Sequence, residues 1–109
     1  MVDQNCPITK AAKVLGRKWT LEMIYYLRER KRFCELQETV GGVNPATLSQ
    51  RLKELERAGI INRYPISDKP RHVEYGLTEK GNDLLEVLSA LASWVYRWYP
   101  EEENGNQLP

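Results

Sequence analysis

The sequence predicts one mainly α-helical domain with a small β-hairpin, an α+β fold class. Over most of the chain, apolar residues recur at intervals of three and four, as expected of helices that bury one side. Residues 60–77 instead combine strand-forming residues with a central turn sequence, which is typical of a hairpin. A length of 109 residues suits a single domain, which we place at 1–100. We expect the acidic tail at 101–109 to be disordered.

The composition argues against several classes of protein. The sequence has no apolar run of about 18 residues and no apolar leader, so we expect no membrane span and a cytoplasmic location. The two cysteines match no zinc-binding spacing, and a single histidine, His72, makes neither a metal site nor a catalytic triad. The glycines form no phosphate-binding loop signature. We therefore expect no enzyme activity, no metal and no cofactor.

Charge is divided unevenly along the chain. Residues 1–71 carry fourteen Lys and Arg against eight Asp and Glu, whereas residues 72–109 carry two against seven. A polyanion such as nucleic acid would prefer the first part. The alternative is an uneven distribution that has no function.

Three helices are predicted before residue 41, at about 7–15, 19–28 and 33–40. Pro7 suits the first position of a helix, and Gly16 ends that helix. Apolar residues in each segment follow helical spacing. In the first segment they are Ile8, Ala11, Ala12 and Leu15. In the other two they are expected to face inward, with Trp19, Met23, Ile24 and Leu27 in the second and Phe33, Leu36 and Val40 in the third.

The fourth predicted helix, at about 45–58, has clear start and stop signals and two different faces. Asn44 can cap its first turn, and Gly59 suits the left-handed position after its last. Leu48, Leu52 and Leu55 form an apolar stripe, while the opposite face is polar and basic. A helix of this kind suits a DNA major groove, but it is equally typical of a core helix with a solvated outer face.

A hairpin is predicted at 60–77, directly after the fourth helix. Residues 60–66 are rich in strand formers, residues 67–71 are turn-forming, and residues 72–77 alternate as a returning strand. The Gly41–Gly42 turn joins the third and fourth helices into a helix-turn-helix. A hairpin after such a pair is called a wing, so the elements predict a winged helix-turn-helix.

The last predicted helix, at about 79–99, starts at the capping residue Thr78 and stops before Pro100. Its apolar residues cover an arc of about 180°. A single core contact needs only about 100°, so we expect a second copy of the chain to cover the rest. The alternative is that the first helix of the same chain covers this surface. The expected dimer contacts are Ile8, Leu88, Leu91, Trp94, Val95 and Trp98.

Several short motifs together resemble the HxlR-type winged helix-turn-helix transcriptional regulators. They are Cys6–Pro7, the segment 16–20 (GRKWT), Arg32–Phe33 with Glu35–Leu36, and the segments 48–60, 70–75 and 77–81. The resemblance covers about residues 6–99. It implies a dimer that binds operator DNA and regulates transcription, with the dimer contacts made by its first and last helices. The chain departs from the family pattern at Cys34 and at Asn44–Pro45. The second departure lies where the helix would enter the groove and so affects base preference.

The DNA-binding residues are predicted from side-chain chemistry. Amides and hydroxyls near the start of the fourth helix suit base edges, whereas Arg and Lys suit phosphates. The residues expected to read bases are Asn44, Thr47, Ser49 and Gln50. The residues expected to hold phosphates are Arg17, Lys18, Arg32, Arg51, Lys53 and Arg57. Lys69, Arg71 and His72 at the wing are expected to reach the minor groove.

Cys6 is the candidate for a thiol switch, because it precedes a helix N-terminus and has Lys10 one turn later. Some HxlR-type regulators use a cysteine at this place, and the resemblance extends that role to Cys6. The alternative is a small apolar residue at the dimer interface. Cys34 is expected to be a packing residue.

The predicted function is thus a sequence-specific, DNA-binding transcriptional regulator, homodimeric on an inverted-repeat operator and responsive to thiol chemistry through Cys6. The first alternative is a winged-helix module that binds protein without specific DNA binding. The second is a thiol-based redox enzyme. The operator, the regulated gene, the sign of regulation and any small-molecule effector are not determined by the sequence.

Overall fold

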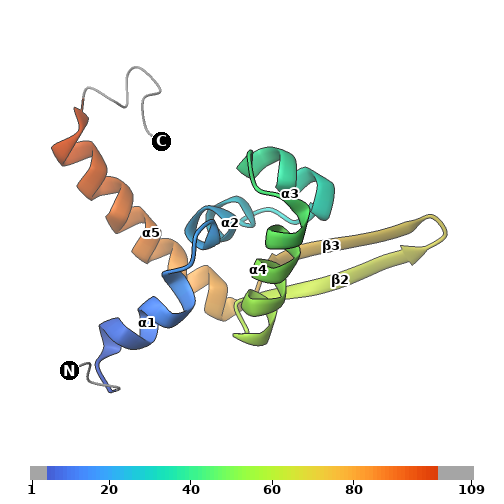
Figure 1. The fold of residues 1–109 in the computed structure, drawn as a ribbon, viewed down its shortest axis with the longest axis horizontal. Helices are drawn as coiled ribbons and strands as arrows, with labels where there is room; N and C mark the ends of the chain where they lie inside the picture. The colour runs from blue at the N-terminus through green and yellow to red at the C-terminus, as the bar shows by residue number, and fades with distance from the viewer. Residues whose placement is uncertain (1–4, 101–109) are drawn as a thin grey trace.

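The computed structural model describes residues 5–100, which form five helices and three strands (Figure 1). In chain order these are α1 Pro7–Leu15, α2 Thr20–Tyr26, β1 Lys31–Arg32, α3 Phe33–Val40, α4 Pro45–Arg57, β2 Ile61–Asp68, β3 Arg71–Leu77 and α5 Glu79–Trp98. The fold is therefore helical with a small sheet, as the sequence predicts. The tail expected at 101–109 lies outside the described residues.

The core lies where α2, α3, α4 and the start of β2 meet. Its buried side chains come from every one of these elements, because each presents one apolar stripe to the others. The stripe of α4 is buried as predicted, with Leu48, Leu52 and Leu55 almost inaccessible to solvent. The remaining core residues are Met23, Ile24, Leu27, Leu36, Val43, Ile60 and Ile61.

The second helix is shorter than predicted, since it begins at Thr20 and ends at Tyr26. Trp19 stands outside it in a left-handed conformation, with φ of 80°, which few non-glycine residues adopt. At the other end, Arg28 Nε donates a hydrogen bond of 2.8 Å to the carbonyl oxygen of Tyr25, which also accepts from the Arg28 N–H at 3.3 Å. The other predicted helices differ from the observed ones by at most one residue at either end.

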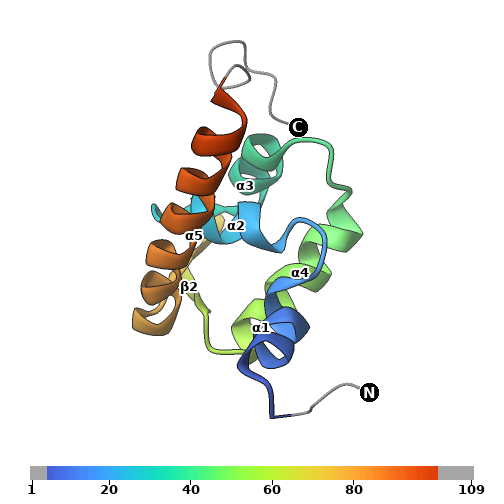
Figure 2. The same ribbon diagram turned by 90° about the vertical axis from the view of Figure 1, so that its left-hand side faces the viewer.

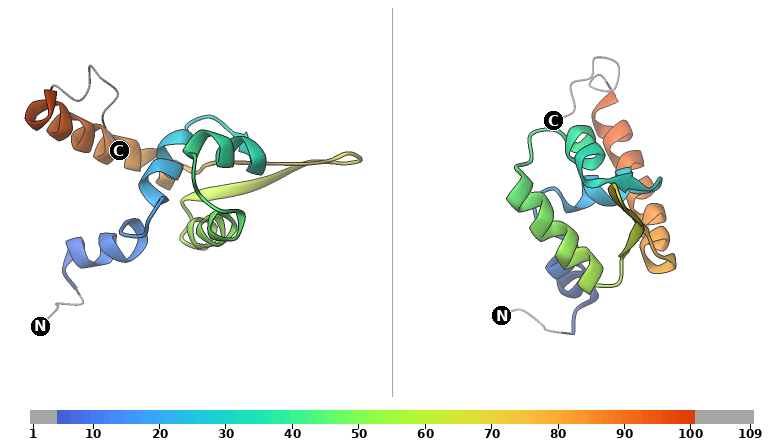
Figure 3. Two further views of the ribbon diagram at one scale, coloured as in Figure 1. Left: turned by 45° about the horizontal axis from the view of Figure 1, so that its top comes forward. Right: turned by 90° about the vertical axis from the view of Figure 1, so that its right-hand side faces the viewer.

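A third strand was missing from the prediction. β1 follows the charged segment after α2 and pairs antiparallel with β3, so the sheet order is β1-β3-β2. Lys31 lies opposite Tyr75, and Arg32 opposite Glu74. β1 has only two residues, too few to show the alternation that identifies a strand in sequence. The hairpin of β2 and β3 extends beyond it (Figure 3).

The start of α5 is tied to the end of α4. The Thr78 hydroxyl donates to the carbonyl oxygen of Gly59 at 2.6 Å and accepts from the N–H of Gly81 at 3.0 Å. Lys80 Nζ donates to the carbonyl oxygen of Ala58 at 2.7 Å. A side chain at Gly81 would collide with the carbonyl oxygen of Ile60, so glycine permits this approach. The direction of α5 is therefore set by the junction between α4 and β2.

Candidate nucleic-acid interface

The outer face of α4 is free in the structure. Ala46, Gln50, Lys53 and Arg57 are all exposed, because the leucine stripe turns the other side of the helix into the core. The helix lies beside the hairpin in the centre of the molecule (Figure 1). An exposed polar helix face is thus positioned next to a projecting two-stranded ribbon.

The start of α4 is held by its cap. Asn44 Oδ1 accepts a hydrogen bond of 2.9 Å from the N–H of Thr47. This bond occupies the Asn44 oxygen and leaves its amide nitrogen available for another acceptor. Thr47 and Ser49 are half-buried, and Gln50 Nε2 donates to Glu54 Oε2 at 3.3 Å. Of the four predicted base-reading side chains, Asn44 and Gln50 are the more accessible.

Two of the predicted phosphate-binding arginines, Arg51 and Arg17, make contacts within the protein. Arg51 Nε donates to the carbonyl oxygen of Lys18 at 2.9 Å, and its side chain is only 12% exposed. Arg17 forms an ion pair with Glu54, 3.4 Å from Nη2 to Oε2. Both contacts attach the loop between α1 and α2 to α4. Arg51 is therefore much less available to a phosphate than its sequence position suggests.

The remaining predicted phosphate-binding residues are exposed but lie on different elements. Lys53 and Arg57 lie on α4, and the Lys18 ammonium lies over the Trp19 ring, 5.0 Å from its centre. Arg32 precedes α3, and its Nη2 lies 3.4 Å from the carbonyl oxygen of Arg71 in the hairpin. The fold thus brings Arg32 and Arg71 together from distant parts of the chain.

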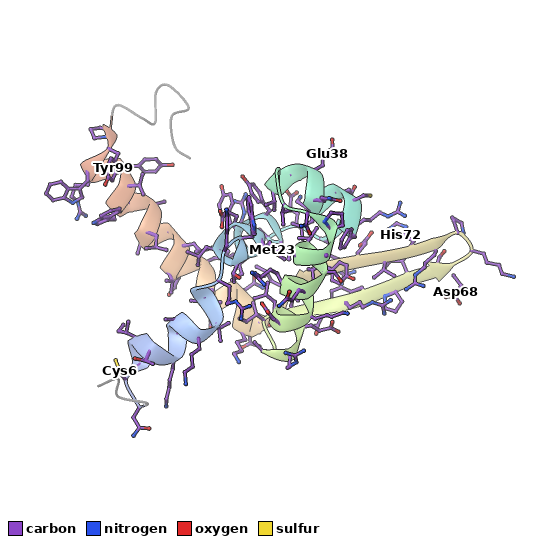
Figure 4. All side chains as sticks on the ribbon, viewed as in Figure 1. Cys6, Met23, Glu38, Asp68, His72 and Tyr99 are labelled. Atoms are coloured by element: carbon purple, nitrogen blue, oxygen red, sulfur yellow. The ribbon has the colours of Figure 1, made fainter. Side chains whose placement is uncertain are left out.

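The hairpin carries the predicted wing residues. Lys69 and Arg71 are exposed at its tip, near Asp68 (Figure 4). His72 is half-buried, and its Nε2 lies 2.8 Å from Glu74 Oε2 on the same strand. His72 is thus engaged by a neighbouring carboxylate, whereas the other two side chains project into solvent.

Two further basic residues at the hairpin were not among the predicted ones. Arg63 is exposed on β2, and the Arg30 guanidinium stacks on the Tyr64 ring, 3.6 Å from its centre. The Arg30 stem also passes close to Gly76, where any side chain would crowd it. The charged segment at 28–32 could have indicated a basic role for Arg30, but its contact with Tyr64 depends on the pairing of β1 with β3.

The apolar side of α5 is largely uncovered within the chain. Trp94 is 50% exposed, Trp98 is 65% exposed, and Ile8 on α1 is 76% exposed. Leu91 is also exposed, whereas Leu88 and Val95 are half-buried. Figures 1 and 2 show α1 and α5 diverging, so α1 does not cover this face. The alternative in which the first helix hides the whole surface is thus wrong.

Cys6 lies at the far end of α1 from the core (Figure 4). Hydrogen bonds from the backbone N–H of Thr9 and then of Ile8, with a smaller contribution from the Thr9 hydroxyl, lower the pKa of the Cys6 thiol. Cys34 is exposed, which corrects its expected packing role: it is the second residue of α3 and lies on the side that faces away from Leu36 and the core. Both thiols are free.

Residues 5–100 contain neither a metal-binding cluster nor a membrane-spanning helix. No group of His, Cys, Asp and Glu side chains in this range is arranged to hold a metal ion. None of the helices in the same range combines the length and apolarity needed to cross a membrane.

A short helix, a glycine-containing turn, a second helix with an exposed polar face and a following hairpin define a winged helix-turn-helix protein. Residues 14–103 match the family model described as HxlR-like helix-turn-helix. The chain belongs to this family of DNA-binding transcriptional regulators.

Relatives and solved structures agree with this assignment. The uncharacterized HTH-type transcriptional regulator YvaP of Bacillus subtilis is 34% identical over 98 residues, which cover 88% of this chain and 91% of YvaP. The reduced form of the transcriptional regulator YodB from B. subtilis has a TM-score of 0.75 and 35% identity, covering 86% of this chain and 94% of that one. YodB has also been solved in quinone-bound and diamide-treated forms. The redox regulator HypR in its reduced form has a TM-score of 0.79 and 30% identity, covering 84% and 92%.

Replacing Asn44 with Ala should lower the free energy of unfolding by about 1 kcal/mol, because the N–H of Thr47 loses its acceptor. Asn44→Ser should stay within about 0.5 kcal/mol of the wild type, since a serine hydroxyl can cap the same turn. Urea unfolding followed by circular dichroism measures both variants. Equal stability of the Ala variant and the wild type would contradict a stabilising role for this cap.

Proposed function

We propose that the protein acts in the cytoplasm as a homodimer that binds an inverted-repeat operator. The observation that carries this proposal is the exposed polar face of α4 beside a basic hairpin. In the bound state, α4 would enter the major groove with Asn44 and Gln50 toward base edges and Thr47 and Ser49 beside them.

Phosphate and minor-groove contacts would surround the reading helix. We assign phosphate contacts to the exposed cations Arg17, Lys18, Arg32, Lys53 and Arg57, with Arg51 acting mainly within the protein. Lys69 and Arg71 at the wing tip would approach the adjacent minor groove, and His72 lies beside them. These charges would supply most of the affinity, and the α4 amides most of the specificity.

The uncovered apolar face of α5 supports the homodimer. Two aromatic rings and a leucine that stay exposed on one helix form a surface that is unfavourable in water. A second copy of the same face can cover it through two-fold symmetry, with Ile8 and the half-buried Leu88 and Val95 at its edges. The tie between α5 and α4 would then fix the distance between the two reading helices.

Selection from random-sequence DNA should enrich an inverted repeat whose half-sites lie about one DNA turn, roughly 34 Å, apart. Gln50→Ala should relax the preference at one position in each half-site, at a cost of about 1–3 kcal/mol for the preferred base. Arg71→Ala should weaken binding to all sequences and reduce its salt dependence.

The matched controls for these variants are Asn82→Ala and Arg97→Ala, which remove an exposed amide and an exposed cation from α5. Both should leave the enriched motif and the affinity unchanged. Failure to enrich any motif would contradict operator binding. If Gln50→Ala and Arg71→Ala both left the DNA affinity unaltered, the protein-interaction alternative would be favoured.

Trp94→Arg or Trp98→Arg should give monomers in sedimentation experiments and weaken operator binding, because each places a charge in the apolar face. Ser93→Arg is the control, since Ser93 lies on the polar side of the same helix. Dimers that persist in both Trp variants would place the interface elsewhere.

We propose a thiol-responsive role for Cys6 as a second function. The lowered pKa of Cys6 supports it, as does the similarity to YodB, which has been solved in reduced and diamide-treated forms. A larger thiolate fraction near neutral pH makes a cysteine more reactive toward oxidants and electrophiles.

Mild diamide treatment should lower operator affinity in the wild type and in Cys34→Ser, but not in Cys6→Ser. Diamide takes two electrons and two protons from a pair of thiols and joins their sulfurs, and in Cys34→Ser this pair can only be Cys6 of the two copies in the proposed homodimer. As the pH is raised, the alkylation rate of Cys6 should increase with a midpoint at a lower pH than for an ordinary thiol. Thr9→Val should move this midpoint to higher pH. Equal operator affinity before and after oxidation would leave Cys6 as an interface residue.

A further inference from the structure

A cavity of about 320 Å³ lies between α1, the start of α2 and the end of α4. Figures 2 and 3 show α1 beside the C-terminal end of α4, where this cavity forms. Its volume lies at the lower end of the range for small-molecule sites, roughly 300–1,000 Å³. The lining residues are Lys13, Val14, Arg17, Thr20, Glu54, Leu55, Arg57 and Ala58.

Positive charge prevails in this cavity, since Lys13, Arg17 and Arg57 line it with only one carboxylate, Glu54. Both Glu54 oxygens are already engaged, Oε2 by Arg17 at 3.4 Å and Oε1 by Arg51 at 3.5 Å. Arg51 does not line the cavity, so it compensates the Glu54 charge from outside. Arg57 has no ion-pair partner among the described residues. The cavity can therefore accept an anion.

Thr20 provides a second, independent observation. Its side chain is 1% exposed, and its hydroxyl is the one buried side-chain nitrogen or oxygen within residues 5–100 that has no hydrogen-bond partner. A buried hydroxyl without a partner lowers stability, so such groups are uncommon in folded proteins. Thr20 is one of the cavity-lining residues, so its hydroxyl can donate a hydrogen bond to a ligand oxygen that reaches it.

The other walls are apolar. Val14, Leu55 and Ala58 also line the cavity. Inorganic phosphate or a DNA phosphate would leave these walls in contact with water, whereas an organic ligand would cover them. We propose that this cavity binds a small organic carboxylate, with the carboxylate toward Arg57, Arg17 and the Thr20 hydroxyl and the apolar body against Val14, Leu55 and Ala58.

Such a ligand would act on α4 through Arg17. The Arg17–Glu54 ion pair joins the loop before α2 to α4, and a bound carboxylate would compete with Glu54 for Arg17. It would also engage two cations that we assign to DNA phosphates, Arg17 and Arg57, and offset one of their two positive charges. The ligand should therefore lower operator affinity, a consequence that rests on the proposed DNA-binding function.

The test is to titrate the ¹⁵N-labelled full-length chain separately with benzoate, with benzyl alcohol and with inorganic phosphate. Binding is measured from the changes in amide chemical shifts. Benzoate should shift the amides of Val14, Thr20 and Ala58 with a dissociation constant on the order of 1 mM. Benzyl alcohol and phosphate should each bind about tenfold more weakly, since one lacks the charge and the other the apolar body. Phosphate binding as tight as benzoate would overturn the carboxylate assignment in favour of a DNA phosphate site. No saturable shift with benzoate would overturn the site.

Variants locate the contacts. Arg57→Gln should weaken benzoate binding about tenfold, whereas Lys53→Gln, which removes an exposed cation outside the cavity, should not. Thr20→Val should also weaken binding, yet its melting temperature should equal or exceed that of the wild type because no internal hydrogen bond is lost. A melting temperature of Thr20→Val below that of the wild type would contradict the role of Thr20. A loss of benzoate binding in Lys53→Gln as large as that in Arg57→Gln would contradict the role of Arg57.

The regulatory consequence has its own measurement. Saturating benzoate should reduce the affinity for the selected operator about tenfold, and benzyl alcohol at the same concentration should not. Amide shifts without a change in DNA affinity would retain the site and overturn its regulatory role. Absence of operator binding with intact benzoate binding would count against the proposed function alone.

Discussion

The leucine stripe of α4 is the constraint on which the rest of the structure depends. Leu48, Leu52 and Leu55 are buried among α2, α3 and the start of β2, and this burial sets the rotation of α4 about its own axis. Because helical residues point outward at about 100° intervals, burying the leucines exposes Gln50 and Lys53. The same core contact thus supplies stability and aims the polar face.

The molecule separates its two kinds of surface. Basic and amide side chains gather on α4 and the hairpin, whereas exposed aromatic rings gather on α5, which extends in the opposite direction (Figures 1 and 3). Water stabilises the first surface and is a poor solvent for the second. The hydrogen bonds of Thr78 and Lys80 join the two surfaces at a single junction, so they set the orientation of α5 relative to the end of α4. The cavity between α1 and α4 lies close to this junction, since Ala58 belongs to both.

Much of the local structure could be predicted from sequence because it depends on neighbouring residues. Asn44 and Thr78 cap their helices as expected, and Gly59 adopts the left-handed conformation that ends α4. The start of α2 was predicted one residue early, because Trp19 suits a helical apolar stripe but lies outside the helix with positive φ. β1 was missed because two residues carry no periodic signal and pair only with a distant strand. Cys34 was expected to pack and is exposed, because the buried stripe of α3 runs through Leu36 and Cys34 lies on the opposite side of the helix.

The sequence by itself determined the order of the five helices and the hairpin, the two faces of α4 and the excess apolar surface of α5. These follow from side-chain spacing and capping, which act within a few residues along the chain. Only the tertiary structure decided that Arg51 binds the carbonyl of Lys18, that Arg32 meets Arg71, and that Thr20 lines a cationic cavity. Each of these contacts joins residues far apart in sequence, and so depends on how whole elements pack. A charged side chain near a groove-binding helix can serve a phosphate or an internal carbonyl equally well, and packing determines which of them lies within its reach.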